Sequence, residues 1–199
     1  MQILTRLESK RPTFFTKNNE HIRAGGVIFR KYNSLGEELW LMQRYYKNPK
    51  KRSRRIYADL GGKTDEEDTC ILDTIIRECR EETNGIITGA EFKNNVESNN
   101  HDKTPDCTIY LKDSRYLLIF MKASDVLKNT DVKDFGDSEV DSEVDSEPHS
   151  KVVNVVKWKR PRTMCWVKPE HVCSNFHIRL KYIKKKLQTN GLTTFIMDK

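Results

Sequence analysis

The segment from Gly61 to Gly85 constrains the fold of this chain more than any other part of its sequence. A Gly-Gly-Lys turn opens it, and apolar side chains then recur at the spacing of one helical face, which we expect to be buried. These side chains are Leu72, Ile75, Ile76 and Cys79. Thr69 is the expected N-cap of the helix, and Asn84 with Gly85 is its expected C-terminal stop. The segment therefore predicts one capped helix that follows a glycine turn.

Three glutamates share another face of this predicted helix. Glu78, Glu81 and Glu82 stand at i, i+3 and i+4, a spacing that brings side chains together on a helix. Like charges at this spacing destabilise a helix unless a positive group gathers them. Carboxylate oxygens are the ligands that hard divalent cations such as Mg²⁺ and Mn²⁺ prefer. We therefore favour a cation site over a solvated acidic face, because a glycine turn and an apolar face accompany the cluster.

The same segment resembles the Nudix box. That box runs from a glycine through an early glutamate to the series Arg-Glu-apolar-any-Glu-Glu. Residues Arg77 to Glu82 fit this series at every specified position, with Cys79 as the apolar member. Gly61-Gly62-Lys63 fits the start of the box. Upstream, the sequence AGGVIF at 24–29 is similar to the opening strand of the Nudix fold.

The resemblance implies both a fold and an activity. The implied fold is α/β, an α-β-α sandwich with a mixed β-sheet, and the implied activity is metal-dependent cleavage of a diphosphate linked to another moiety. The implied metal ligands are Glu78, Glu81, Glu82 and the backbone carbonyl of Gly61. Glu78 is also the implied base that deprotonates water, and Arg77 is implied to orient the carboxylates through a salt bridge. Some family members take the base from a later loop, which leaves these alternatives open: Glu139, Glu143, Glu147 and Glu170.

The chain departs from the box at two places. The spacing from Gly62 to Arg77 is one residue longer than the pattern, so the early carboxylate position falls on Asp68 or Thr69, with Glu67 as a further alternative. Asn84 replaces the late glycine, and asparagine is the next best residue for a left-handed cap. The three later glutamates are intact, which favours a working enzyme.

Length and composition set limits on the class of protein. The 199 residues suffice for one domain with its own core, and 36% hydrophobic with 33% charged residues indicates a soluble protein. No apolar run reaches the roughly 18 residues of a membrane-spanning helix, and the N-terminus lacks the apolar core of a signal peptide. The five cysteines form no paired motif, so we expect reduced thiols, no zinc site and a cytoplasmic location. We expect an N-terminal extension at 1–20 and a Nudix domain at 21–199.

Charge is distributed unevenly along the chain. Residues 131–147 contain eight acidic residues and one lysine, a local charge of −7, and the whole chain carries +7, which leaves +14 for the rest. The acidic, low-complexity stretch at 131–150 is expected to be a disordered insertion, because it has little apolar content to offset its ordering entropy. The basic remainder favours a polyanionic partner, with RNA as one candidate, over a merely solubilising surface.

Several strands are expected around the helix. Alternating or continuously apolar runs predict strands at 12–16, 21–32, 38–46, 106–112, 115–123, 151–158 and 163–168. The run at 115–123 is apolar throughout, so we place it centrally in the sheet. An amphipathic helix with a basic face is expected at 174–187.

A basic loop precedes the glycine turn. Six of the nine residues at 47–55 are basic, and Pro49 and Ser53 indicate a loop near the mouth of the predicted site. The candidate phosphate contacts are Arg44, Lys51, Arg52, Arg54, Arg55 and Lys63. Tyr45, Tyr57 and Trp158 are candidates for stacking on a base, although most such aromatics pack in a core.

These observations predict a Mg²⁺- or Mn²⁺-dependent pyrophosphohydrolase acting on a nucleotide-type substrate. The basic segments favour capped mRNA, and hence decapping, as the substrate. Free nucleoside diphosphate derivatives and diphosphoinositol polyphosphates explain the same charges and remain alternatives. A non-catalytic Nudix module that binds RNA is the alternative from another functional class. The oligomeric state is open.

Overall fold

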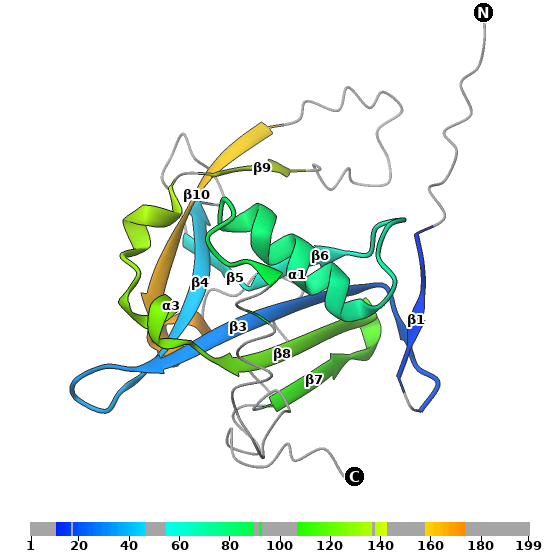
Figure 1. Ribbon diagram of the computed structural model, residues 1–199, viewed down its shortest axis with the longest axis horizontal. Helices are drawn as coiled ribbons and strands as arrows, with labels where there is room; N and C mark the ends of the chain where they lie inside the picture. Colours follow the sequence, from blue (N-terminus) through cyan, green and yellow to red (C-terminus); the bar gives the residue numbers. More distant parts are fainter. Residues whose placement is uncertain are drawn as a thin grey trace, which may run out of the picture.

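A mixed eight-stranded sheet forms the centre of the fold (Figure 1). The computed structural model describes residues 11–16, 18–46, 55–89, 92, 107–136, 138–142 and 158–173, and only the backbone at 107, 138–142, 158–161 and 173. The strand order is β7-β8-β3-β4-β10-β9, with β5 paired to β4 and β6 paired to β3. The strands are β3 (Ala24–Tyr32), β4 (Glu38–Tyr46), β5 (Arg55–Ala58), β6 (Leu60–Lys63), β7 (Cys107–Leu111), β8 (Tyr116–Lys122), β9 (Ser138–Ser142) and β10 (Trp158–Val167). Strands β3 and β8 are parallel and the other pairs are antiparallel.

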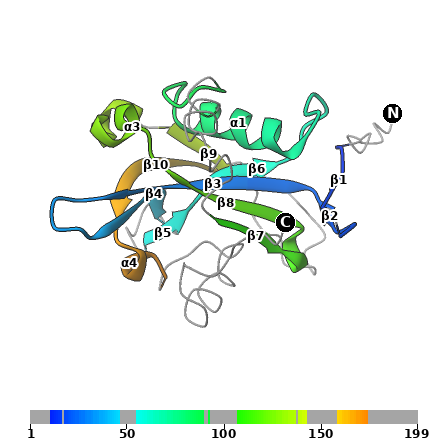
Figure 2. The same cartoon turned by 60° about the horizontal axis from the view of Figure 1, so that its bottom comes forward.

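Helices cover both faces of this sheet (Figure 2). Helix α1 (Ile71–Glu82) and the short helix α3 (Asp125–Asn129) lie on one face, and α4 (Pro169–Cys173) lies on the other. Two 3₁₀ turns, η1 (Lys112–Ser114) and η2 (Val132–Phe135), and a separate hairpin of β1 (Phe14–Phe15) and β2 (His21–Ile22) complete the described elements. The expected α/β class with a mixed sheet is confirmed.

Alternation along the strands builds a separate core on each face. In β3, Val27 and Phe29 pack with Ile75 and Cys79 of α1, whereas Ile28 packs on the opposite side. The opposite core contains Trp40, Phe120 and Val172 of α4, among others. Because successive side chains of a strand point to opposite faces, both sides of these strands are apolar and buried.

The sheet forks between β3 and β4. These strands pair with each other at Phe29–Tyr32 and Glu38–Leu41, and beyond that point they separate. The first part of β3 then pairs with β6, and the last part of β4 pairs with β5. Asp59 is the single residue between β5 and β6, so it lies where the chain crosses from one branch to the other.

Most expected elements are present with small shifts. The strand expected at 38–46 is β4, and the runs at 115–123 and 106–112 give β8 and β7. Two details of α1 were wrong: its N-cap is Cys70 and not Thr69, and Leu72 is 37% exposed while Ile71 packs against the core instead. Ile71 stands four positions before Ile75 and eight before Cys79, so the three side chains share one face of the helix.

The acidic segment contains more regular structure than its charge predicts. Residues 132–135 form η2, and Phe135 is 1% exposed within the core beneath α1. Strand β9 follows and pairs with β10. Residues 143–150, and the helix expected at 174–187, lie outside the described part of the chain. Within the described residues, no helix has the length and apolar character needed to cross a membrane.

Candidate functional site

Helix α1 is held by polar contacts at both ends. The Asp73 carboxylate accepts hydrogen bonds from the backbone N–H of Thr69 and of Cys70, at 3.0 and 3.1 Å, which satisfies donors that the helix itself leaves open. At the other end Asn84 and Gly85 have φ of 53° and 81°. The Gly85 N–H donates to the Arg80 carbonyl at 2.8 Å, so the predicted left-handed stop is confirmed.

Arg77, in the middle of α1, gathers one acidic side chain from before the helix and two from its C-terminal half. Its guanidinium lies 3.1 Å from Asp68, 3.1 Å from Glu78 and 3.5 Å from Glu81. It also donates to the backbone carbonyl of Lys63 at 2.9 Å, which joins the helix to the end of β6. The positive group that the glutamate spacing requires is therefore supplied from within the same helix.

Asp68 is the early carboxylate that the structure brings to Arg77. Its side chain also accepts hydrogen bonds from the Asp65 N–H and the Thr74 hydroxyl, both at 2.7 Å. Burial alone would raise the pKa of Asp68, but these bonds and the Arg77 guanidinium outweigh burial and lower it. Of the three alternatives, Glu67 is exposed, and Thr69 bonds to Asp73 instead. Sequence spacing left this choice open, and tertiary contact decides it.

Glu78 lies directly on the glycine strand. A Cβ atom placed on Gly62 would overlap the Glu78 carboxylate, so only glycine permits this approach. The Glu78 side chain is 16% exposed, which leaves part of it accessible from the surface. The expected Gly-Gly-Lys turn is part of strand β6 instead, and the position of the Glu78 carboxylate requires glycine at position 62.

The Glu82 carboxylate is held by Gly61, which precedes Gly62 in the same strand. Its Oε2 accepts a hydrogen bond from the Gly61 N–H at 2.7 Å, and its Oε1 lies 2.9 Å from the Arg162 guanidinium of β10. Gly61 thus contacts Glu82 through its backbone N–H. Two adjacent residues of β6 therefore seat two of the three glutamates.

Beneath these glycines lies a buried polar pair that sequence reasoning missed. The Tyr116 hydroxyl donates to the Asp59 carboxylate, and the two residues are 2% and 0% exposed. A Cβ on Gly26 would overlap both groups and one on Gly61 would overlap the Tyr116 hydroxyl, so these two glycines leave room for the pair, whereas Gly62 leaves room for Glu78. An acidic residue in an apolar stretch, two positions before Gly61, is the signal that could have identified Asp59.

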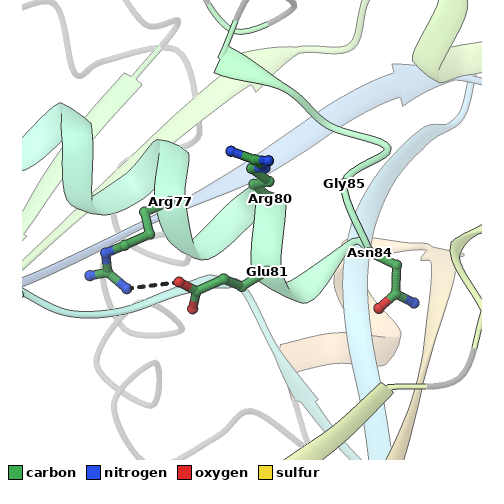
Figure 3. A pocket seen from close by; sticks show the side chains of 5 residues that line it. All are labelled: Arg77, Arg80, Glu81, Asn84 and Gly85. Atoms are coloured by element: carbon green, nitrogen blue, oxygen red, sulfur yellow. Dashed lines mark hydrogen bonds and ion pairs between the residues drawn. The ribbon is translucent and has the colours of Figure 1, made fainter.

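An open hollow lies along the outer side of α1 (Figure 3). It has a volume of about 440 Å³ and is lined by Arg77, Arg80, Glu81, Asn84 and Gly85. Figure 3 shows Arg77 and Glu81 pointing toward each other across its floor. Two guanidinium groups beside a carboxylate give this surface a mixed but mainly positive lining.

The donor set fits a hard divalent cation in its chemistry. Glu78 and Glu82 offer carboxylate oxygens at neighbouring points of β6, and Glu81 is 57% exposed beside them. Within the described part of the chain, no three Asp, Glu, His or Cys side chains are grouped closely enough to form a metal site as they stand. The carboxylate oxygens contact the guanidinium groups of Arg77 and Arg162 instead.

The described structure does not bring the predicted phosphate contacts to the acidic cluster, although Arg44 and Arg55 are neighbours in the β4–β5 pair. Arg44 lies on the face opposite α1, because it follows Met42 of the opposite core by two positions, and it donates to the Thr163 hydroxyl at 3.2 Å. Arg55 is exposed and hydrogen-bonded to Tyr46, an interaction that raises the pKa of Arg55. Lys63 is exposed at the end of β6, next to α1. Lys51, Arg52 and Arg54 lie outside the described residues.

The alternative bases and the aromatic candidates are likewise either away from the acidic cluster or outside the described residues. Glu170 is exposed on α4, on the face opposite α1, so it is remote from the glutamate cluster. Tyr57 packs in the core on that opposite face, and Tyr45 is half-buried, with Arg162 as its partner in the β4–β10 register. The side chains of Glu139, Glu143, Glu147 and Trp158 are outside the described part of the structure.

The cysteines that the structure describes are free thiols. Cys70 is exposed, Cys79 is buried and Cys165 is partly buried. Burial raises the pKa of Cys165 to about 11, and burial together with the nearby carboxylates of Glu82, Asp59 and Glu78 raises that of Cys79. Both thiols are therefore protonated at neutral pH, which suits a packing role.

Comparison with known solved structures finds a distant structural likeness. No protein-family model matches the chain, and no curated protein matches it. Among solved structures, the chain is similar to a crystal structure of RenU, a Nudix hydrolase from M. smegmatis. The two are 11% identical, the match covers 94% of this chain and 100% of that one, and the TM-score is 0.40. At this distance the likeness carries no argument about activity, which has to rest on the residues of the site.

Proposed function

We propose that this protein is a divalent-cation-dependent hydrolase of the Nudix type, which cleaves a diphosphate linkage in a nucleotide-type substrate. The observation that carries the proposal is the seating of α1 on the glycine strand. Arg77 gathers Asp68, Glu78 and Glu81, while Glu78 and Glu82 lie on Gly62 and Gly61. This arrangement supports the role that the Nudix resemblance implies for Arg77, which is to orient the carboxylates.

Each side chain has a distinct role in the proposed reaction. Glu78, Glu81 and Glu82 would hold Mg²⁺ or Mn²⁺, and the backbone carbonyl of Gly61 remains a candidate ligand. A bound divalent cation neutralises the charge of a diphosphate and activates water for attack. Glu78 is the candidate to accept the proton of that water on a carboxylate oxygen, because it is partly accessible beside the glycine strand. Arg77 would position the carboxylates and would not contact the substrate.

Capped mRNA is the favoured substrate within this proposal. The chain outside 131–147 carries +14, and Arg77 and Arg80 line the open hollow on α1. Positive charge at this density favours a highly charged anion, and RNA presents one charge per nucleotide. Free nucleoside diphosphate derivatives and diphosphoinositol polyphosphates are the competing substrates that the experiment must separate.

The test is product release from a substrate panel with Mg²⁺. The panel contains cap-labelled RNA, a free cap analogue, nucleoside diphosphate derivatives and diphosphoinositol polyphosphates. We expect the wild-type protein to release a capped diphosphate from RNA, and Glu82→Gln to release no more than a sample without enzyme. Glu67→Gln is the matched control, because Glu67 is exposed and outside the Arg77 cluster. Absence of release from every substrate would reject the enzyme and favour the non-catalytic RNA-binding alternative.

A further inference from the structure

Arg162 reaches the acidic cluster from a part of the sequence far from the helix. It lies in β10, and 80 positions separate it from Glu82 in the chain. Its guanidinium nitrogen is 2.9 Å from Glu82 Oε1, and the two side chains are only 9% and 11% exposed. The contact is therefore a largely buried ion pair on one of the proposed cation ligands, formed by a residue outside the box.

The position of Arg162 is set by the strands and not by Glu82 alone. The same nitrogen donates to Gln43 Oε1 at 2.8 Å, and Gln43 is 2% exposed in β4. The Gln43 amide in turn donates to the Asp59 carbonyl at 2.8 Å. Arg162 thus belongs to a chain of hydrogen bonds that runs from the fork of the sheet to the end of α1.

A fixed guanidinium at this point opposes a divalent cation on the same carboxylate. Two positive ions that share one carboxylate repel each other, and burial weakens the screening that solvent and salt would provide. The Gly61 N–H holds the other oxygen of Glu82, so loss of Arg162 would leave the carboxylate anchored. Repulsion therefore outweighs the orienting effect of Arg162 on Glu82.

We propose that Arg162 neutralises Glu82 in the metal-free protein and weakens the binding of divalent cations to the acidic cluster. This inference rests on the proposed function, because it takes Glu82 to be a cation ligand. Arg162 would act through Glu82 and not by contact with the cation, and it would set the cation concentration at which the site fills. The proposal predicts the direction in which cation affinity changes. Removal of the guanidinium charge tightens cation binding, whereas loss of a merely structural residue would weaken it.

The test is a titration of the full-length protein with Mn²⁺, followed by electron paramagnetic resonance of the free ion. We expect Arg162→Gln to lower the Kd for Mn²⁺ by at least about tenfold, because it removes a nearby positive charge. Arg162→Lys keeps the charge and is expected to bind Mn²⁺ within about threefold of wild type. In the Glu82→Gln background, Arg162→Gln should bring no gain, because the repulsion acts at Glu82.

A second variant and a second measurement guard against loss of folding. Arg162→Met fills a similar volume without a charge, and the rise of its melting temperature with Mn²⁺ should exceed that of wild type. Equal or weaker Mn²⁺ binding by Arg162→Gln and Arg162→Met would overturn the role of Arg162 and leave the proposed function standing. If Glu82→Gln binds Mn²⁺ as wild type does, Glu82 is no ligand and the role of Arg162 is overturned, whereas the proposed function fails only if no substrate of the panel is cleaved.

Discussion

The Arg77 guanidinium lies 3.1 Å from the Asp68 carboxylate, which comes from the turn before the helix that Arg77 belongs to. The Asp68 side chain is 3% exposed, whereas that of Arg77 is 26% exposed. Arg77 therefore meets one buried carboxylate on its inner side and two glutamates further along the helix. Asp68 holds the Arg77 guanidinium in place, and Arg77 in turn positions Glu78 and Glu81.

Replacement of Asp68 by asparagine should destabilise the protein. Asp68→Asn retains the shape but removes the charge that Arg77 and the Asp65 N–H bind. We expect the free energy of unfolding to fall by about 2–3 kcal/mol, the range for hydrogen bonds to a charged group. Urea denaturation measures this change. Asp65→Asn is the matched control, since that side chain is exposed, and it should change the value by less than about 0.5 kcal/mol.

Acid should reveal the same interaction. The pKa of Asp68 is lowered in the folded protein, so its contribution to stability is complete above the unfolded pKa of about 3.9 and is lost as the pH falls through the folded value. The free energy of unfolding of the wild type should therefore decline more steeply below about pH 4 than that of Asp68→Asn. Urea titrations at several pH values would show this, and parallel curves for the two proteins would contradict it.

Two glycine substitutions should separate activity from stability. In Gly62→Ala the new Cβ meets the end of the Glu78 side chain, which can move. The fold should survive, while displacement of the carboxylate lowers kcat by about a hundredfold. In Gly26→Ala the new atom meets the buried Asp59 and Tyr116 groups and the Leu60 carbonyl, so folding itself should suffer. Melting temperatures and turnover measured on both variants test the contrast, and equal losses of stability would refute it.

The buried Tyr116 hydroxyl should contribute to stability. Tyr116→Phe removes its hydrogen bond to the Asp59 carboxylate and should cost about 1–3 kcal/mol. Tyr110→Phe is the matched control, because its hydroxyl donates to the His21 carbonyl at an exposed position. We expect less than about 0.5 kcal/mol for the control. Chemical denaturation measures both losses of stability. Equal losses for the two variants would show that burial does not strengthen the hydrogen bond between Tyr116 and Asp59.

Asn84 should tolerate glycine better than alanine. Its φ of 53° is costly for a residue with a Cβ, and its side-chain amide also donates to the Phe135 carbonyl of η2. Both variants lose this hydrogen bond, but only Asn84→Ala adds backbone strain. Asn84→Ala should therefore be about 1 kcal/mol less stable than Asn84→Gly. Thermal unfolding of the pair measures the difference, and the reverse order would contradict the assigned cap.

The helix and its neighbouring strands were predictable because their signals are local. The periodicity of α1, the left-handed stop at Asn84 and the bounds of β4 all follow from residues adjacent in the chain. The start of α1 was misplaced by one residue, because Thr69 and Cys70 both precede Asp73 and only the folded geometry shows which backbone becomes helical.

The polar contacts beneath the helix were not predictable in the same way. Gln43 and Arg162 are polar residues on the face of β4 and β10 where Leu41, Met164 and Trp166 are apolar. A polar residue at such a position is the signal that could have drawn attention to them. Their partners lie on other strands, so the sequence does not pair them. Arg44 shows the same limit, because the sequence alone does not tell which face of β4 lies toward α1.

The fork of the sheet means that the acidic cluster is assembled from two branches. Glu78 rests on Gly62, whose strand pairs with β3, whereas Glu82 is paired with Arg162, whose strand pairs with β4. Glu82 also accepts a hydrogen bond from Gly61 of β6, so its carboxylate is held by both branches at once. A change in the splay of β3 and β4 would move Arg162 relative to the Gly61 N–H that holds the same carboxylate. The contact between Arg162 and Glu82 would therefore respond to changes at the apex of the fork, at residues that lie outside the acidic cluster.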